Sequence, residues 1–304
     1  MKRDKYWLGV SGLVVVLLVI LGLSMVPWRT MHQERQPIRV ITSLDFYGEV
    51  AQEVAGKYGQ VTALINNASI DPHDYQPGTS QAQKMAQANV VIQNGLGYDH
   101  WLTKLTQSAG SRHYTVVDVG SQVAHKHSGD NEHVWYDPQT MGHLADTLAS
   151  RYSKIDPEHR AYYQRRARQY HRSLVPLNRE IARVKANVGD KRAVAVSEPV
   201  FDYALNALGY RVIDAHFEKA IEDGNDPSPQ DIQELQQAIT NHQIAFFVEN
   251  RQASDHVINN MVRLAHKHGV PVLKVTETKP NGVSYVQWML SQYRQLARIQ
   301  QEGE

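Results

Sequence analysis

Short β-branched segments alternate with helix-forming segments along most of this chain, and no other sequence feature constrains the fold as strongly. A first series of such segments occupies residues 38–42, 60–65, 90–93 and 114–118. A second series occupies residues 192–196, 211–213, 244–248 and 271–275. Because strands that alternate with helices build βαβ units, each series predicts one parallel sheet.

A helix-forming stretch separates the two series. Residues 157–187 are rich in Arg, Gln, Ala, Leu and Tyr, and apolar side chains recur every three to four positions in their second half. Pro157 favours a helix start, and Pro176 predicts a kink within the helix. The sequence therefore predicts an α/β protein whose two βα lobes, residues 38–156 and 188–304, are joined by one long helix over residues 157–187.

The first residues differ from the rest of the chain. Residues 1–5 are mostly basic, and residues 6–26 carry no charge. As a helix, the uncharged segment would span roughly 30 Å, the thickness of the hydrocarbon core of a bilayer. We expect residues 1–27 to be an N-terminal membrane anchor or a cleaved signal segment, and residues 28–37 to be a linker. The lobes would then lie at the extracellular face of the cytoplasmic membrane, or be secreted if the segment is cleaved.

The composition narrows the possible chemistry. The 304 residues include no cysteine and 15 histidines. Disulfides, thiolate metal sites, cysteine nucleophiles and a lipid-modified N-terminal cysteine are therefore excluded. A transition metal would have to be bound by imidazole and carboxylate groups. The net charge of +1 gives no sign of a nucleic-acid-binding surface.

Four side chains suited to metal binding follow predicted strands, at the edge where open α/β sheets bind their ligands. They are His73, His133, Glu198 and Glu277. Each lobe contributes two, so two imidazoles and two carboxylates can surround one divalent cation between the lobes. Taken singly, each has a second interpretation, because loop histidines are commonly solvated and Glu198 would also suit the N-terminus of the helix that follows it.

Four segments around these residues resemble the ligand motifs of the metal-binding solute receptors of zinc and manganese ABC importers (the ZnuA/TroA-like, or cluster A-I, family). They are residues 71–77 (DPHDYQP), 133–138 (HVWYDP), 196–203 (VSEPVFDY) and 276–285 (TETKPNGVSY). The resemblance covers about residues 38–302. It implies that the metal ligands are His73, His133, Glu198 and Glu277.

Several positions depart from the family pattern. Asn131 and Glu132 stand where members usually have Asp-Pro before the second ligand, and Glu198 stands where zinc-type members often have histidine. The loop at residues 279–282 is short and divergent, so Glu277 has alternates as the fourth ligand. These alternates are Glu222, Asp223 and Asp226.

The resemblance implies a receptor that captures one divalent metal ion between the lobes and delivers it to an ABC permease, without catalysis. Imidazole and carboxylate together accept manganese, iron(II) or zinc, and carboxylates that bind through both oxygens raise the coordination number, which favours manganese over zinc. Zinc-type members often carry a long histidine-rich loop. In this chain the corresponding segment has only His125 and His127. They are either a short version of a loop that collects metal ions or simply solvated side chains. We expect a monomer that binds no nucleic acid.

Two other functions remain open at this point. A zinc hydrolase would keep an open coordination position for water, but the sequence lacks the His-Glu-x-x-His and Gly-x-Ser-x-Gly motifs. A surface protein or adhesin for a non-metal ligand would contain no metal after purification. The metal content of the purified protein therefore separates this last function from the other two.

Overall fold

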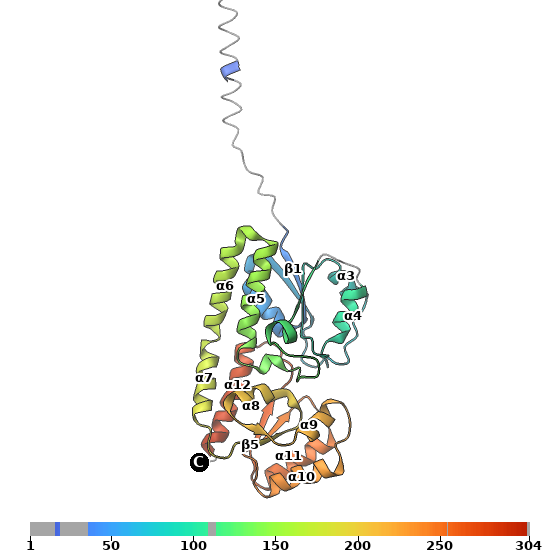
Figure 1. Cartoon of the computed structure of the whole chain (residues 1–304), viewed down its shortest axis with the longest axis vertical. Coiled ribbons are helices and arrows are strands. Elements are labelled where there is room, and N and C mark those ends of the chain that lie inside the picture. Colours follow the sequence, from blue (N-terminus) through green and yellow to red (C-terminus); the bar gives the residue numbers. More distant parts are fainter. Residues whose placement is uncertain (1–15, 19–35, 109–113, 254, 303–304) are drawn as a thin grey trace, which may run out of the picture. The chain divides into compact units, whose positions relative to one another are not determined.

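The two series of strands form two parallel sheets in the computed structural model, which describes residues 16–18, 36–108, 114–253 and 255–302 (Figure 1). The first sheet has the order β2-β1-β3-β4, with strands β1 (Ile38–Leu44), β2 (Gly59–Ile65), β3 (Val90–Gln93) and β4 (Thr115–Asp118). The second has the order β6-β5-β7-β8, with strands β5 (Ala193–Val196), β6 (Arg211–Val212), β7 (Phe247–Asn250) and β8 (Val272–Val275). The two halves therefore repeat one strand order, and the predicted α/β class with two parallel lobes is confirmed.

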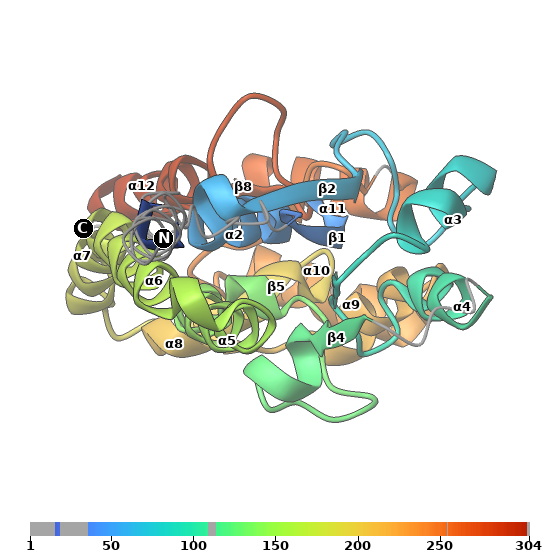
Figure 2. The same ribbon diagram turned by 90° about the horizontal axis from the view of Figure 1, so that it is seen from above.

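Helices follow the strands of the N-terminal lobe. They are α2 (Asp45–Ala55), α3 (Thr79–Met85), α4 (His100–Ser108) and α5 (Thr140–Ile155). α2 starts directly after β1, because Asp45 suits the positive end of the helix dipole. Its buried residues Phe46, Val50 and Val54 recur at helical spacing. α3 and α4 lie at the end of the sheet away from α5 (Figures 1 and 2).

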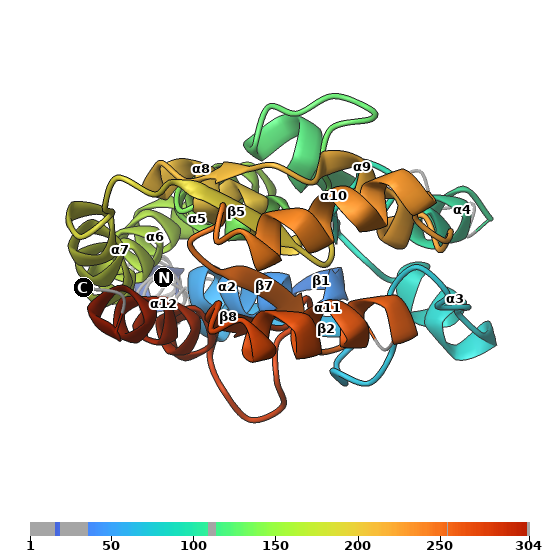
Figure 3. The same cartoon turned by 90° about the horizontal axis from the view of Figure 1, so that it is seen from below.

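Among its described residues, the C-terminal lobe contains five α-helices, two of which begin with a capping side chain. They are α8 (Asp202–Leu208), α9 (Ala215–Glu222), α10 (Pro229–Thr240), α11 (His256–Lys267) and α12 (Tyr285–Glu302). Ser228 caps α10 by accepting a hydrogen bond from the amide of Asp231, and Asp255 caps α11 in the same way. Figure 3 shows α10 and α11 side by side, and α12 next to the helix that links the lobes.

The helical link between the lobes consists of two helices in sequence, α6 (Arg160–Ser173) and α7 (Val175–Ala186), after a short turn at Pro157–His159. The interruption falls at Leu174, two residues before Pro176. Proline has no amide hydrogen and its ring collides with the preceding turn, so the helix restarts with Pro176 in its first turn. The predicted kink is therefore a break, and the two helices run along one side of both lobes (Figure 1).

One hydrophobic cluster runs through both lobes, and a second, smaller cluster lies within the C-terminal lobe. α12 follows the last strand of the C-terminal lobe, yet its Trp288 ring lies 5.7 Å from the ring of Phe46 in the N-terminal lobe. The hydroxyl of Tyr285 donates a 2.6 Å hydrogen bond to the carbonyl of Trp135. Pro37–Glu304 consequently form one compact unit.

The predicted anchor or signal over residues 1–27 and the linker over residues 28–37 lie almost wholly outside the described residues. Within the part of the chain that the structure describes, no helix is both long and apolar enough to cross a membrane. The predicted domain boundaries stay predictions.

Candidate metal centre

A cavity of about 620 Å³ is lined by residues of both lobes that follow strands β2, β5, β7 and β8. Three of the four predicted ligands line it, namely His73, Glu198 and Glu277. The fourth, His133, is completely buried, and its Nε2 lies 3.8 Å from Oε1 of Glu222, which also lines the cavity. The ends of the two sheets thus bring all four predicted residues into one region.

The loop after β2 holds His73 in a defined position. The amide of His73 donates a 2.8 Å hydrogen bond to Oδ1 of Asp71, and the indole of Trp101 donates a 2.9 Å hydrogen bond to the carbonyl of Pro72. The imidazole packs edge-on against the ring of Tyr98, with 4.8 Å between ring centroids. Its Nε2 lies 3.9 Å from Oε1 of Glu277 in the other lobe.

Asn131 determines how His133 presents its ring. The Oδ1 atom of Asn131 accepts the backbone amide of His133 and lies 2.9 Å from its Nδ1, while Nδ2 of Asn131 donates to the carbonyl of Pro199. Because an amide oxygen only accepts, Nδ1 must carry the proton, and Nε2 keeps a free lone pair. That buried Nε2 has no hydrogen-bond partner among the described residues. Burial lowers the pKa of His133 to about 3, so the ring stays neutral, as a metal ligand must be.

Glu198 and Glu277 each have one oxygen engaged by a neutral donor. Asn250 donates through Nδ2 to Oε2 of Glu198 at 2.6 Å, and the hydroxyl of Tyr98 donates to Oε1 of Glu277 at 2.6 Å. Burial, with added repulsion from Glu277, raises the pKa of Glu198 to about 7. Burial likewise raises the pKa of Glu277. A divalent metal ion bound between these carboxylates would compensate their charge and lower the pKa of both.

Two further carboxylates reach this region. Glu132 precedes His133, and Glu222 ends α9. One ligand atom from each of His73, Glu132 and Glu222 lies within 4.8 Å of the others, and Nε2 of His73 is 3.4 Å from Oε1 of Glu132. Burial, followed by repulsion from the neighbouring glutamates, raises the pKa of Glu222 to about 10.

Sequence reasoning named Glu222 only as an alternate and did not include Glu132 among the ligands. The one available signal for Glu132 was that an acidic residue stands where the family motif usually has proline. Of the other alternates, Asp223 lines the cavity but pairs with Lys219, and Asp226 is exposed and does not line it. His125 and His127 are exposed on a loop, and His127 lies near Asp130.

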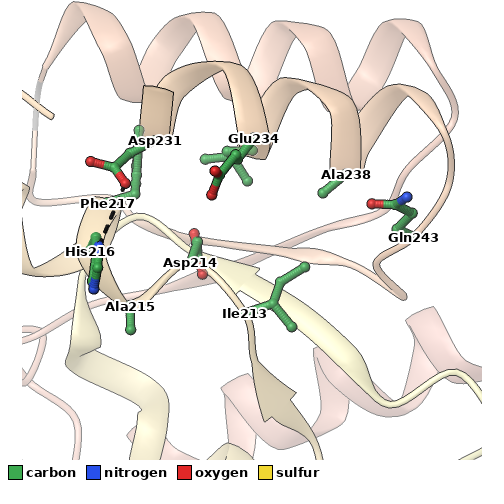
Figure 4. A pocket seen from close by; sticks show the side chains of 10 residues that line it. Ile213, Asp214, Ala215, His216, Phe217, Asp231, Glu234, Ala238 and Gln243 are labelled. Carbon is green, nitrogen blue, oxygen red and sulfur yellow. Dashed lines mark ion pairs between the residues drawn. The ribbon is translucent and has the colours of Figure 1, made fainter. Parts of the chain in front are cut away.

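A separate cavity of about 360 Å³ lies between α9 and α10 in the C-terminal lobe (Figure 4). His216 and Asp231 approach each other there at 3.8 Å. None of the four predicted ligands lines this cavity, so it is distinct from the metal centre.

The family described as "ZnuA: Zinc-uptake complex component A periplasmic" matches residues 40–299. The chain belongs to the ZnuA family. Members of this family are substrate-binding receptors of ABC transporters for metals and not enzymes, so a hydrolase function is excluded. The predicted receptor class is confirmed.

Individual relatives of this ZnuA-family chain differ in the metal that their names carry. The manganese-binding lipoprotein MntA of Bacillus subtilis is 25% identical over 242 residues, which cover 77% of this chain and 78% of MntA. The substrate-binding protein FpvC of P. aeruginosa, solved with Ni²⁺, has a TM-score of 0.72 at 20% identity and covers 88% of this chain and 98% of its own. The periplasmic zinc-binding protein TroA of Treponema pallidum has a TM-score of 0.72 at 16% identity, and the match covers 87% of this chain and 99% of TroA. These structures share the fold.

Proposed function

We propose that this chain binds one divalent transition metal ion, manganese in preference to zinc, and delivers it to the permease of an ABC importer. The proposed ligands are His73, His133, Glu198 and Glu277. One observation carries the proposal: Nε2 of His133 is fully buried, has no hydrogen-bond partner among the described residues and lies 3.8 Å from Oε1 of Glu222 in the other lobe. A bound cation would satisfy this lone pair and the carboxylates together.

The preference for manganese rests on the oxygen-rich surroundings. Glu198 and Glu277 each retain an oxygen beyond the one that Asn250 or Tyr98 engages. Carboxylate oxygens suit a hard cation that accepts more than four ligands, whereas zinc in proteins is commonly tetrahedral with nitrogen or sulfur ligands. Zinc outranks manganese in intrinsic affinity at nearly any such site, so the preference must come from geometry and coordination number.

The receptor would act outside the cytoplasmic membrane as a monomer. Residues 1–27 would tether it there, or direct its secretion if they are cleaved. Docking on the permease would then bring the cavity between the lobes to the transport pathway.

Titration of chelator-treated protein with Mn²⁺ and Zn²⁺ tests the proposal. Wild-type protein is expected to bind one ion per chain. His73→Ala and His133→Ala should weaken binding by about 100-fold or more, beyond the 10–100-fold typical of partners outside the coordination sphere. His216→Ala is the matched control, because its exposed imidazole lies beside the separate cavity. The proposal fails if wild-type protein binds neither metal, or if both ligand variants bind as wild type while retaining its thermal transition.

A further inference from the structure

Two cavities meet at the metal centre. Besides the cavity of about 620 Å³, there is a second one of about 510 Å³, and His73, Glu222 and Asp223 line both. Glu198 and Glu277 line only the first cavity, whereas Glu132 lines only the second. The carboxylates near the imidazoles are therefore divided between two spaces.

The second cavity also has a set of ligand atoms, most of which it shares with the first. Nε2 of His73 lies 3.4 Å from Oε1 of Glu132, and both lie within 4.8 Å of a carboxylate oxygen of Glu222. The buried, unpartnered Nε2 of His133 lies 3.8 Å from Oε1 of Glu222. Glu132 belongs to the N-terminal lobe and Glu222 to α9 of the C-terminal lobe, so these residues also bridge the lobes.

We propose that the metal ion has two alternative positions that share His73 and His133. One position uses Glu198 and Glu277, and the other uses Glu132 and Glu222. This inference rests on the proposed metal-binding function and extends it. Each imidazole offers one Nε2, so one ion occupies one position at a time and moves between two pairs of carboxylates.

The charges around the second position make it the weaker one. Lys219 lines the second cavity and pairs with Asp223. Its ion pair with Asp223 offsets part of its charge, and the remainder reduces the attraction of Glu132 and Glu222 for a cation. Weak binding that exchanges quickly suits a point where the ion enters or leaves, while the first position, without a lysine among its lining residues, holds it.

Variants that remove one carboxylate pair separate the positions. The double variant Glu198→Gln/Glu277→Gln should still bind one Mn²⁺ ion, with an affinity reduced about 10- to 100-fold. On that background, Glu132→Gln or Glu222→Gln should weaken the remaining binding at least a further tenfold. Glu234→Gln on α10 removes the same charge from an exposed side chain in the same lobe and is the control.

The outcomes distinguish this inference from the proposed function. If wild-type protein binds Mn²⁺ but the Glu198→Gln/Glu277→Gln variant does not, the two-position proposal is overturned and the single site stands. It is also overturned if residual binding is unaffected by Glu132→Gln and Glu222→Gln. If wild-type protein binds neither Mn²⁺ nor Zn²⁺, the proposed function itself fails. Should the double variant lack the wild-type thermal transition, the same comparison is made in Glu198→Gln alone.

Discussion

The hydroxyl of Tyr98 in the N-terminal lobe donates a 2.6 Å hydrogen bond to Oε1 of Glu277 in the C-terminal lobe. Tyr98 is completely buried, and its ring also packs edge-on against the imidazole of His73. One side chain thus contacts a proposed ligand from each lobe. It fixes one oxygen of Glu277 and the tilt of the His73 ring at the same time.

Tyr98→Phe tests this positioning role. The ring would still pack against His73, but Glu277 would lose its donor, so the affinity for Mn²⁺ should fall about tenfold, as for other partners that orient metal ligands. Calorimetric titration measures the change. Tyr152→Phe is the control, because it removes another buried hydroxyl, which donates to the carbonyl of Ala51 at 3.4 Å and lines neither cavity of the metal centre. If Tyr98→Phe and Tyr152→Phe bind Mn²⁺ with equal affinity, the hydroxyl of Tyr98 does not position Glu277 for metal binding.

Metal binding should weaken as the pH falls from 8 to 6. Protonation of His133 is not the cause, because burial lowers the pKa of this ring to about 3 and it does not titrate in that range. Burial raises the pKa of Glu198 to about 7, so this carboxyl gains a proton as the pH falls and becomes a poor ligand. Titrations in two buffers with different ionisation enthalpies should detect proton release on Mn²⁺ binding. Glu198→Gln should reduce that release, and a pH-independent affinity in wild type would contradict the assignment.

Glu198→His should shift the preference towards zinc. The substitution replaces an oxygen ligand by nitrogen and leaves three imidazoles, a set typical of tetrahedral zinc sites. The ratio of zinc to manganese affinity is expected to rise about tenfold or more, since histidine favours zinc over manganese. Competition between the two ions, followed by the metal content of the recovered protein, measures it. Glu234→His on α10 is the control. If its ratio of zinc to manganese affinity equals that of Glu198→His, Glu198 is not a metal ligand.

Asp202 and Glu218 should make stability depend on pH. Burial raises the pKa of Asp202 to about 7, and burial with repulsion from Asp202 and Asp214 raises the pKa of Glu218 to about 9. The folded protein therefore retains protons that the unfolded chain releases above about pH 4.3, so stability falls as the pH rises from that value towards 9. Glu218→Gln cannot ionise and should raise the free energy of unfolding at pH 8 by about 1 kcal/mol. Thermal unfolding at pH 5 and pH 8 should show a smaller difference in the variant than in wild type.

Local patterns predicted the fold well, because each strand and the helix after it are encoded within a short segment. The same holds for the loop at residues 71–77, where Asp71 and Pro72 act on the adjacent His73. α5 carries the same kind of local signal, because Met141, Leu144, Leu148 and Tyr152 recur at helical spacing and are buried where the helix packs against α2 and α6.

The sequence alone could not predict that Glu132 and Glu222 lie close together. The two residues are 90 positions apart and lie in different lobes, and their proximity depends on the direction in which α9 leaves the second sheet. The position of the helix break at Leu174 likewise depends on how the turn before Pro176 relaxes.

The placement of α12 has a consequence for synthesis. Strands β1 to β4 leave the ribosome first, but Phe46 and Trp135 pack against Trp288 and Tyr285, which are made about 150 residues or more later. At roughly 5–20 residues per second, this interval lasts on the order of ten seconds. Throughout it, Phe46 and Trp135 can pack against each other but lack Trp288 and Tyr285. A chaperone that shields this aromatic surface would therefore act on nascent chains that have not yet reached residue 288.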